Sequence, residues 1–524
     1  MAFGLLTEPA TRQNTSQAPT SKSTSVPPPV GGLNYRDDKS AMKPQFATLM
    51  DNLFPNATTA DIRRGYASHA TGMGSSNTIK TLMTWNGASS SKMKACVNGS
   101  IYDVTAAGAV GAAEVSGLSV NDWQWCNFTN SAGTTFLVAC NGTDAVRNYD
   151  GSSWTSPSIT GSGLTSANLI YVHPFKNRLW FVEKNSPNAW YLPTGAIAGT
   201  ASKQNLGAQF SDGGSLIAIG TISSDAGDGA DDKIAFVSSL GQIVVYQGTD
   251  PSSATTWQLV GIYSMGYPVG RRCLVKVGGD TGIITNTSIV SIKQAMTLDR
   301  AAAERGAITN LVQRLFNQYA RDYGSNSGWM PIVYPKGKYL LINVAFSTTQ
   351  YVQLIMNTTT GAWCRFTGMN GYCWGLLGEN LYFGGTNGVV YKADTGYQDN
   401  AGVITADLRE AWNYLDGTSR QKFVTFARPI IQTDGAPSIL FNFNADFQEV
   451  DPTGSITASA PANSLWGTAT WGSGVWGGES ASITNWNNPQ AVGYIFAPRL
   501  KITTNGAAFS LNTIDVQYQP GGPI

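Results

Sequence analysis

The sequence carries few of the side chains that usually perform catalysis. It contains two histidines, His69 and His173, which is too few for most histidine-based zinc sites and argues against a Ser-His-Asp or Cys-His triad. Walker-type phosphate loops, HExxH helices and Gly-x-Ser-x-Gly turns are missing from the sequence. We therefore expect no catalytic, metal-binding or cofactor-binding residues, and a protein that is not an enzyme.

The densest group of carboxylates lies in the loop from Ser224 to Asp232, where aspartates are interspersed with glycines. Oxygen ligands on such a loop could surround Ca²⁺. The loop lacks the ligand spacing and the bidentate glutamate of an EF-hand, so a solvated turn before a strand is the stronger interpretation. Two short basic spots, Arg63-Arg64 and Arg271-Arg272, lie beside glycines and are much smaller than a nucleic-acid-binding patch.

The six cysteines form no CxxC motif, and most of them lie in apolar, strand-like runs. We expect buried free thiols rather than disulfides or metal ligands. The cysteines are Cys96, Cys126, Cys140, Cys273, Cys364 and Cys373.

A tract of Trp-Gly pairs places Trp466, Trp471 and Trp476 at intervals of five residues. Spacing this regular indicates a packed loop or an exposed contact surface, and exposed indole rings can stack on sugars. Other tryptophans, such as Trp154 and Trp257, follow a turn at the end of a strand. That position predicts packing between neighbouring sheets rather than contact with a ligand.

The elements that must position these side chains are β-hairpins. The clearest one joins Lys233–Ser238 to Gln242–Tyr246 through a turn at Leu240-Gly241. The pattern recurs at roughly 40 to 60 residues, with an aromatic residue closing a strand, which predicts a β-propeller with four-stranded blades. Three copies turn at the dipeptide that type I′ turns prefer, namely Asn98-Gly99, Asn141-Gly142 and Asn387-Gly388.

One segment inside the repeats, residues 299–323, predicts an amphipathic helix. Its apolar residues share one face, Asp299 is a suitable N-cap, and Gly324 is a suitable stop. Gly306 weakens the middle and is a point where the helix could divide. The helix either covers an edge of the propeller or forms an interface with a partner.

The first 77 residues precede the repeats. Residues 1–30, rich in Thr, Ser, Gln and Pro, predict an extended N-terminal arm. Residues 31–77 are interpreted as an entry segment with a short helix, because four apolar residues between Phe46 and Leu53 recur at helical spacing. Ile62–Tyr66 is then expected to be a strand that enters the first blade.

The rest of the chain divides near residue 400. Residues 78–400 are assigned to the propeller, and residues 401–524 to a C-terminal β-sandwich-like domain, in which Ser438–Phe447 alternates apolar and polar residues. The expected fold class is all-β, a propeller of hairpin or meander blades with one inserted amphipathic helix, followed by a sandwich-like domain.

Composition excludes several functional classes. The net charge is +1 and only 13% of residues are charged, so no global basic field indicates binding to nucleic acid. No apolar run approaches the roughly 20 residues of a membrane-spanning helix, and the short apolar stretch Phe3–Leu6 is not a secretory signal. We therefore expect no membrane-spanning segment.

Several ordered strings resemble a recurrent family of tailed-phage virion proteins. The resemblance spans nearly the whole chain after residue 26, and it indicates the β-propeller tail hub or nozzle family of short-tailed, podovirus-type phages, which is similar to tail tubular protein B. The strings include PPVGGLN at 28–34, DNLFP at 51–55, FKNRLWFV at 175–182, VYQGTDP at 245–251, GRRCLVK at 270–276, GAWCRF at 361–366 and QPGGP at 519–523.

The resemblance implies a homohexameric ring in the short tail of a virion, assembled in the host cytoplasm. The ring would lie below the portal and its adaptor protein, carry tail fibre or spike proteins outside, and hold and then conduct double-stranded DNA without sequence specificity. The main alternative is a receptor-binding or glycan-binding tail propeller, which would usually be a trimer. A secreted propeller lectin is a weaker alternative, because we expect no signal peptide.

Overall fold

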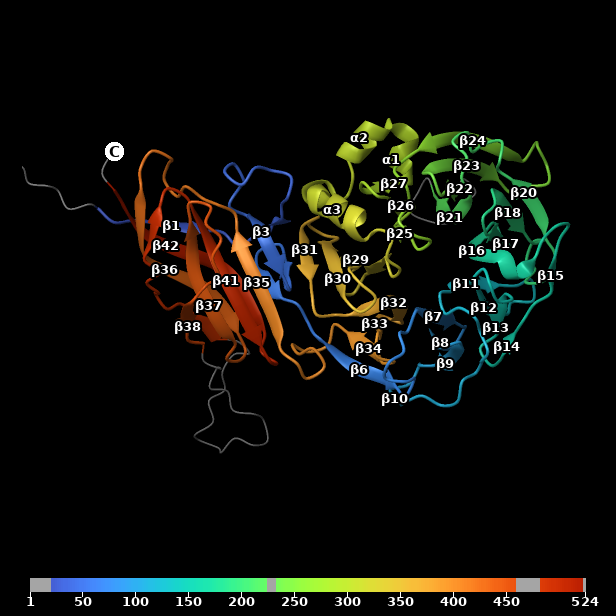
Figure 1. Cartoon of the computed structure of the whole chain (residues 1–524), viewed down its shortest axis with the longest axis horizontal. Helices are drawn as coiled ribbons and strands as arrows, with labels where there is room; N and C mark the ends of the chain where they lie inside the picture. Colours follow the sequence, from blue (N-terminus) through green and yellow to red (C-terminus); the bar gives the residue numbers. More distant parts are fainter. Residues whose placement is uncertain (1–19, 224–231, 459–480, 522–524) are drawn as a thin grey trace, which may run out of the picture.

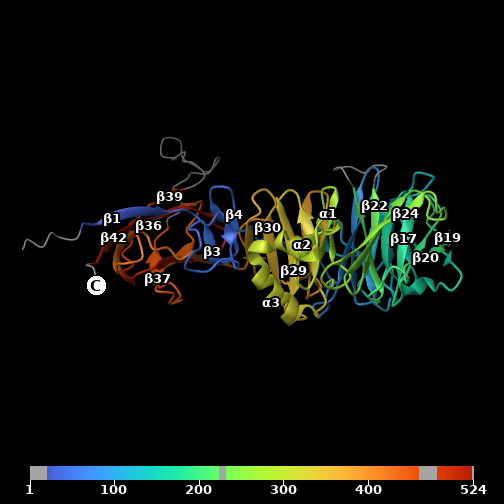
Figure 2. The same ribbon diagram turned by 90° about the horizontal axis from the view of Figure 1, so that it is seen from above.

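The computed structural model describes residues 20–223, 232–458 and 481–521. The chain is all-β, with a β-propeller and a sandwich-like domain arranged side by side along the long axis (Figures 1 and 2). The Trp466–Trp476 tract and residues 224–231 of the acidic loop lie outside the described residues.

Seven blades surround the axis of the propeller, each begun by its innermost strand. Blades 1 to 4 are β7 (Thr81–Asn86), β8 (Ser91–Val97) and β9 (Ser100–Asp103); β11 (Gln124–Thr129), β12 (Thr135–Cys140), β13 (Arg147–Tyr149) and β14 (Trp154–Thr155); β16 (Leu169–Phe175), β17 (Arg178–Glu183), β18 (Asn188–Tyr191) and β20 (Ser202–Asn205); and β21 (Leu216–Ile222), β22 (Lys233–Ser238), β23 (Gln242–Gly248) and β24 (Trp257–Ser264). Blades 5 to 7 are β25 (Leu274–Val277), β26 (Asp280–Ile284) and β27 (Ile289–Ser291); β28 (Met330–Tyr334), β29 (Tyr339–Ala345), β30 (Tyr351–Asn357) and β31 (Trp363–Phe366); and β32 (Gly371–Leu377), β33 (Asn380–Gly385), β34 (Val390–Ala393) and β6 (Tyr66–Thr71).

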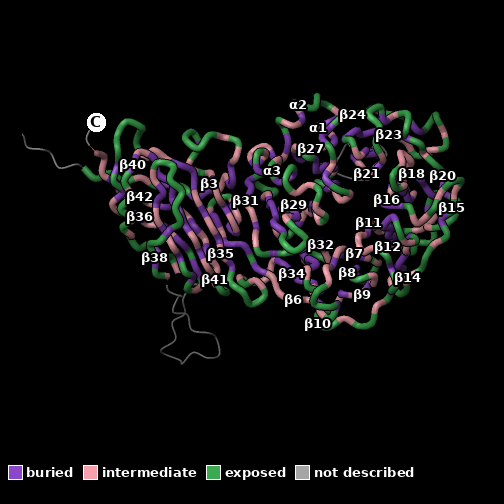
Figure 3. The backbone as a smooth tube through the Cα atoms, in the orientation of Figure 1, coloured by how far each residue is buried: buried purple, intermediate pink, exposed green. Residues whose placement is uncertain are grey.

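Three two-residue strands of the described propeller lie outside its blades. β10 (Gly108–Ala109) lies parallel to β6, and β15 (Ile159–Thr160) lies parallel to β19 (Gly199–Thr200). The short helix η1 (Ser166–Asn168) directly precedes β16. Buried residues follow the strands, whereas exposed residues concentrate in the connecting loops (Figure 3).

The predicted hairpins are confirmed. In the first blade Asn98 and Gly99 both have positive φ, 46° and 70°, as a type I′ turn requires. Gly241, at the turn between β22 and β23, has φ of 84°, and the oxygen of Met265 would lie 2.6 Å from a Cβ at this position. Glycine is therefore required there on two grounds.

The last blade is completed by a strand from the start of the chain. β6 pairs antiparallel with β34, with Tyr66 opposite Ala393 and Ala70 opposite Val390. The expectation that the strand near Ile62–Tyr66 enters the first blade was therefore wrong. An early strand that finishes the last blade ties the two ends of the ring together by backbone hydrogen bonds, whereas entry into blade 1 would leave the ring open.

The predicted helix at 299–323 is divided, as Gly306 suggested. The segment contains α2 (Arg300–Arg305), η2 (Asn310–Val312) and α3 (Gln313–Tyr323), and a further helix, α1 (Ile292–Thr297), precedes it. The Asp299 side chain accepts a hydrogen bond of 2.8 Å from the backbone of Ala302, and Gly306 is the C-cap of α2. The rings of Tyr319 and Tyr323 on α3 pack against Phe346, so α3 lies against blade 6 at the end of β29.

The C-terminal domain consists of two facing sheets. The first contains β36 (Lys422–Thr433), β42 (Phe509–Pro520), β39 (Ala481–Ile483), β40 (Ala491–Gly493), β1 (Lys22–Val26), β4 (Leu53–Pro55) and β5 (Ala60–Ile62). The second contains β2 (Gly32–Leu33), β3 (Phe46–Asp51), β35 (Ile404–Glu410), β41 (Phe496–Thr504), β37 (Ser438–Ala445) and β38 (Gly454–Ile456). Alternate residues of each strand, such as Leu408, Leu500 and Ile431, fill the core between the sheets.

Two expectations for the first 77 residues therefore need correction. Residues 46–55 form strands β3 and β4, not a short helix. β3 pairs with β35, a partner that no local window of sequence reveals, and β4 pairs with β5. Most of the predicted entry segment completes the C-terminal domain. The described part of the arm also contains β1, which pairs with β42 from Lys22 to Val26.

The propeller and the C-terminal domain share one sheet. Blade 6 continues through β2 and β3 into β35, β41, β37 and β38, which makes ten strands in a single sheet. Arg365 on β31 forms a two-pronged ion pair with Asp51 on β3, at 2.6 Å for each contact. One buried apolar core also runs from the propeller into the C-terminal domain. Backbone pairing, charge and packing thus join the two parts.

Candidate functional site

Two cavities lie along the central channel of the propeller. A cavity of about 760 Å³ lies where β11, β16 and β21 end, and a second of about 380 Å³ lies beside β7, β28 and β32. Tyr171 and Leu274 line both cavities. These two side chains therefore form the boundary between them.

The side chain of Arg272, which precedes the inner strand of blade 5, lies across one end of the channel. Its guanidinium donates hydrogen bonds to the carbonyl oxygens of Lys80 (3.0 Å) and Trp123 (3.2 Å). It also lies 3.8 Å from the carboxylate of Asp122, which accepts a bond of 2.9 Å from the hydroxyl of Tyr372. We call these five residues the Arg272 lock. They join blade 5 to blades 1, 2 and 7 across the axis.

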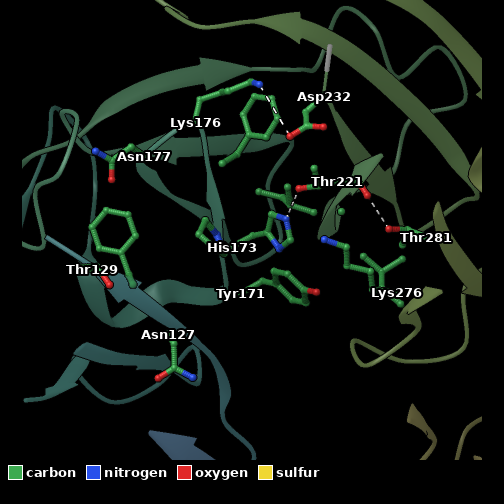
Figure 4. Close-up of a pocket in the computed structure, with 16 residues that line it drawn as sticks. Asn127, Thr129, Tyr171, His173, Lys176, Asn177, Thr221, Asp232, Lys276 and Thr281 are labelled. Atoms are coloured by element: carbon green, nitrogen blue, oxygen red, sulfur yellow. Dashed lines mark hydrogen bonds and ion pairs between the residues drawn. The ribbon is translucent and has the colours of Figure 1, made fainter. Parts of the chain in front are cut away.

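Polar side chains from four blades surround the larger cavity at the other end (Figure 4). Nε2 of His173 lies 2.6 Å from Oγ1 of Thr221, and Oγ1 of Thr281 donates a bond of 2.7 Å to the carbonyl oxygen of Thr221. Lys176 and Asp232 form an ion pair at 3.8 Å. Hydroxyl, amide and ammonium groups thus share the cavity with aromatic rings.

His173 is uncharged at neutral pH in this environment. Burial, with a smaller effect from the ammonium of Lys276, lowers the pKa of His173 to about 4. Burial also raises the pKa of the Tyr171 hydroxyl well above its usual range. The cavity therefore offers neutral imidazole and phenol groups beside lysines, which suits binding through hydrogen bonds and ring contacts.

The residues that the sequence analysis named as possible site residues do not lie together in the structure. His173 lies in the channel, whereas Nε2 of His69 contacts the carbonyl oxygen of Val104 at 3.0 Å, outside the channel cavities. Asp232, the described end of the acidic loop, borders the larger cavity. Arg271 and Arg272 diverge, because Arg271 reaches the carbonyl oxygen of Asn141 at 3.3 Å.

The pair Arg63-Arg64 also divides into a buried and an exposed residue. Arg63 is only 2% exposed and pairs with Asp399, with N–O distances of 2.6 and 2.8 Å. It also donates to the side chain of Asn52 and the carbonyl of Thr367, each at 2.8 Å. Its function is to fix the first residues of the chain to the end of the propeller, not to contact phosphate.

The cysteines are free thiols, and five of the six are buried. Burial raises the pKa of each of these thiols. Among residues 20–223, 232–458 and 481–521, no group of three or more His, Cys, Asp or Glu side chains is arranged to hold a metal ion. No helix in the same ranges is long and apolar enough to cross a membrane.

Sequence reasoning did not identify the cavity, whose polar residues are spread over four blades. His173 was noticed as a rare residue, but Lys176, Thr221 and Lys276 were not singled out. A usable signal existed, because the first strand of each repeat lines the channel, and polar residues in such strands face its interior.

No protein-family model and no curated protein sequence matches this chain. Among solved structures, it is similar to BBS1N in complex with ARL6DN, with 10% identity over 63% of this chain and 97% of that chain and a TM-score of 0.39. It is also similar to YCF48 bound to D1 peptide, with 12% identity, 66% and 98% coverage and a TM-score of 0.36. The extracellular domain of the hybrid two-component system BT3049 from B. thetaiotaomicron gives 10% identity, 82% and 59% coverage and a TM-score of 0.41. These likenesses are distant, and the propeller assignment stands on the strand pairing of this chain.

Proposed function

We propose that this chain is a structural virion protein that forms the ring-shaped nozzle or hub of a short phage tail. The proposal starts from the ordered strings that resemble the tail hub and nozzle family. Its expected partners are further copies of the chain in a homohexamer, the portal-adaptor protein, tail fibre or spike proteins, and DNA in transit.

The observation that carries the proposal is the ten-stranded sheet shared by blade 6 and the C-terminal domain. A subunit that surrounds a DNA path must keep its shape while neighbouring subunits and packaged DNA press on it. Domains joined only by a linker move relative to each other by default. A shared sheet, the Arg365–Asp51 ion pair and a continuous core oppose such motion.

The Arg272 lock constrains where the DNA would pass. Arg272 lies across one end of the channel inside each propeller and donates hydrogen bonds to blades 1 and 2. In the proposed ring, the genome therefore passes through a lumen between subunits. A chain with net charge +1 suits such a path, because a strongly basic wall would retain the DNA.

Negative-stain electron microscopy of the purified full chain, alone and mixed with its adaptor, tests the proposal. We expect sixfold rings with an open centre, in which the propellers surround the lumen. Trimers, or a monomer that does not bind the adaptor and binds host polysaccharide, would refute the nozzle function.

The second candidate function is a tail propeller that binds a receptor glycan. The cavity of about 760 Å³ favours it, because it combines the aromatic rings of Tyr171 and Phe175 with Asn127 and Thr129. Calorimetry with host polysaccharide tests this function. Asn127→Ala should weaken binding at least tenfold, while Lys203→Ala, on the outer strand of blade 3, should leave it unchanged. Absence of binding by the unmodified protein would exclude this candidate.

A further inference from the structure

The outer face of the first C-terminal sheet carries a group of exposed apolar side chains. Phe423, Phe426, Trp486 and Val492 are 37%, 43%, 48% and 52% exposed. We call these four residues the outer patch. Single exposed apolar residues are common, but a contiguous group of large ones marks an interaction site.

Strand geometry explains why these side chains gather on one face. Phe423 on β36 lies directly opposite Val492 on β40. The pairing of β36 with β42 shifts between Val424 and Phe426, and such a bulge places one extra residue in the strand. Both phenylalanines therefore point outward, while Val424 and Ala427 between and after them are fully buried.

An arginine adds a further contact at the patch. The guanidinium of Arg428 lies 4.8 Å from the ring centre of Trp486, and Arg428 pairs with Asp515 at 2.6 Å. Its charge is thus neutralised within the sheet. The surface is apolar and aromatic, without a net charge that would recruit a charged partner.

The chain enters this sheet close to the outer patch. Lys22 lies opposite Tyr518 on β42, and Tyr518 lies opposite Val424 on β36. Neighbouring strands are about 4.8 Å apart, so Lys22 lies roughly 10 Å from the β36 residue next to Phe423. Residues before Lys22 therefore start within two strands of the patch.

Those residues include an apolar group in an otherwise polar segment. Phe3, Leu5 and Leu6 are followed by a stretch rich in Thr, Ser and Gln. The tether from Leu6 to Lys22 can span at most about 3.3–3.6 Å per residue, or roughly 50 Å. That length exceeds the separation severalfold. We propose that Phe3, Leu5 and Leu6 dock on the outer patch of the same chain and cover it.

Several features favour this occupant. The patch is apolar, as are the three side chains, and the tether raises their local concentration at the patch. Burial of Phe3, Leu5 and Leu6 favours docking, whereas ordering of the tether opposes it. We therefore expect docking to be reversible, which would keep the patch available to a partner that displaces the segment.

Photo-crosslinking tests the contact directly. The photoreactive amino acid p-benzoylphenylalanine replaces Phe426 in the full chain, and a matched control carries it at Leu298, which is 45% exposed near the propeller helices. We expect a crosslink from position 426 to residues 1–8, and none of this kind from position 298. Equal mixing of isotopically light and heavy protein identifies the chain that supplies the segment.

The isotope pattern decides the outcome. Products that join light to light and heavy to heavy chains support docking within one chain. Mixed products with residues 1–8 would show that the segment comes from a neighbouring copy, and mixed products with any other surface would identify a second copy seated on the patch. Either result, or the absence of crosslinks to residues 1–8, would overturn the proposal.

A second measurement uses a dye that fluoresces on exposed apolar surface. The variant with Phe3→Ser, Leu5→Ser and Leu6→Ser should raise dye fluorescence at least twofold, and adding Phe426→Ser should reverse most of the increase. The control changes three polar residues of the same segment, Thr11→Ser, Gln13→Ser and Asn14→Ser. Equal fluorescence in the two triple variants would contradict docking. Ring formation is measured separately, so this proposal and the nozzle function can fail independently.

Discussion

Nη2 of Arg272 donates a hydrogen bond of 2.7 Å to Oγ1 of Thr81, although Arg272 precedes blade 5 and Thr81 begins blade 1. These blades are as far apart as a ring of seven allows. A single side chain therefore crosses the axis and connects opposite walls of the propeller. Two other residues of the lock also contact each other, because the ammonium of Lys80 lies 5.7 Å from the ring centre of the buried Tyr372.

We expect Arg272→Ala to lower the free energy of unfolding by about 2–4 kcal/mol, because charged hydrogen bonds from a largely buried guanidinium are lost. Urea denaturation measures the effect. Arg271→Ala is the matched control, since Arg271 makes one hydrogen bond of 3.3 Å and should cost less than about 1 kcal/mol. Equal losses in both variants would show that the lock does not stabilise the ring.

The pair Arg63 and Arg64 provides a second comparison of neighbours. Arg63→Leu should cost about 3–5 kcal/mol, because it leaves Asp399 without its partner in a largely buried pair. Arg64 is exposed and lies 4.0 Å from Asp394. Arg64→Leu should therefore change stability by less than about 0.5 kcal/mol. Thermal unfolding of both variants checks the difference, and a small effect of Arg63→Leu would contradict the assigned role.

Glu410 predicts a pH dependence of stability. It is completely buried, neither carboxylate oxygen has a hydrogen-bond partner among the described residues, and burial raises the pKa of Glu410 well above 4.5. Above about pH 4.5 the unfolded chain gives up this proton more readily than the folded chain, so stability falls as pH rises towards the folded pKa. Glu410→Gln should remove this slope and stabilise the protein by about 1–3 kcal/mol at pH 8.

The control for Glu410 is Glu449, a carboxylate whose pKa is lowered instead of raised. Hydrogen bonds from Lys39 and Arg409 overcome a burial effect and lower the pKa of Glu449, so its contribution exists above its unfolded pKa and is lost as pH falls. Glu449→Gln should change stability at neutral pH and not in acid. Chemical denaturation between pH 4 and 8 separates the two cases (pH 4 is near the ordinary pKa of a glutamate). Equal pH profiles for Glu410→Gln and the unmodified protein would contradict the Glu410 prediction.

Removal of residues 1–62 should prevent the C-terminal domain from folding. This deletion removes β1 to β5 and exposes the edges of β42 and β35, and such edges pair with other chains. We expect aggregation and loss of a cooperative unfolding transition. Deletion of residues 1–21, which precede β1, should leave the transition in place. A soluble, cooperatively folding 63–524 chain would disprove the dependence.

The sequence identified features whose signals are local. The turn at Gly241 and both of its strands lie within a short window, so the hairpin could be predicted from turn chemistry and alternation. The division of the helix at Gly306 was suggested by the low helix propensity of glycine. The alternation in Ser438–Phe447 likewise indicated a half-buried strand, which is β37.

Non-local pairing explains what the sequence did not reveal. Asp51 and Arg365 are 314 residues apart, so no periodicity could show that Phe46–Asp51 pairs with blade 6. The apolar residues between Phe46 and Leu53 recur at helical spacing and predict a helix, but pairing with distant strands makes Phe46–Asp51 a strand. The channel had the same difficulty, because His173, Thr221 and Lys276 come from three blades.

The pairing of β6 with β34 has a consequence for biosynthesis. About 320 residues separate the two strands, and at translation rates of 5–20 residues per second the ribosome needs roughly 16–65 s to make that interval. During this time β6 lacks its antiparallel partner β34, and β1 and β5 wait still longer for β42. Proteins dominated by such distant contacts fold slowly and expose aggregation-prone edges. We expect the nascent chain to depend on a chaperone until its last strand has left the ribosome.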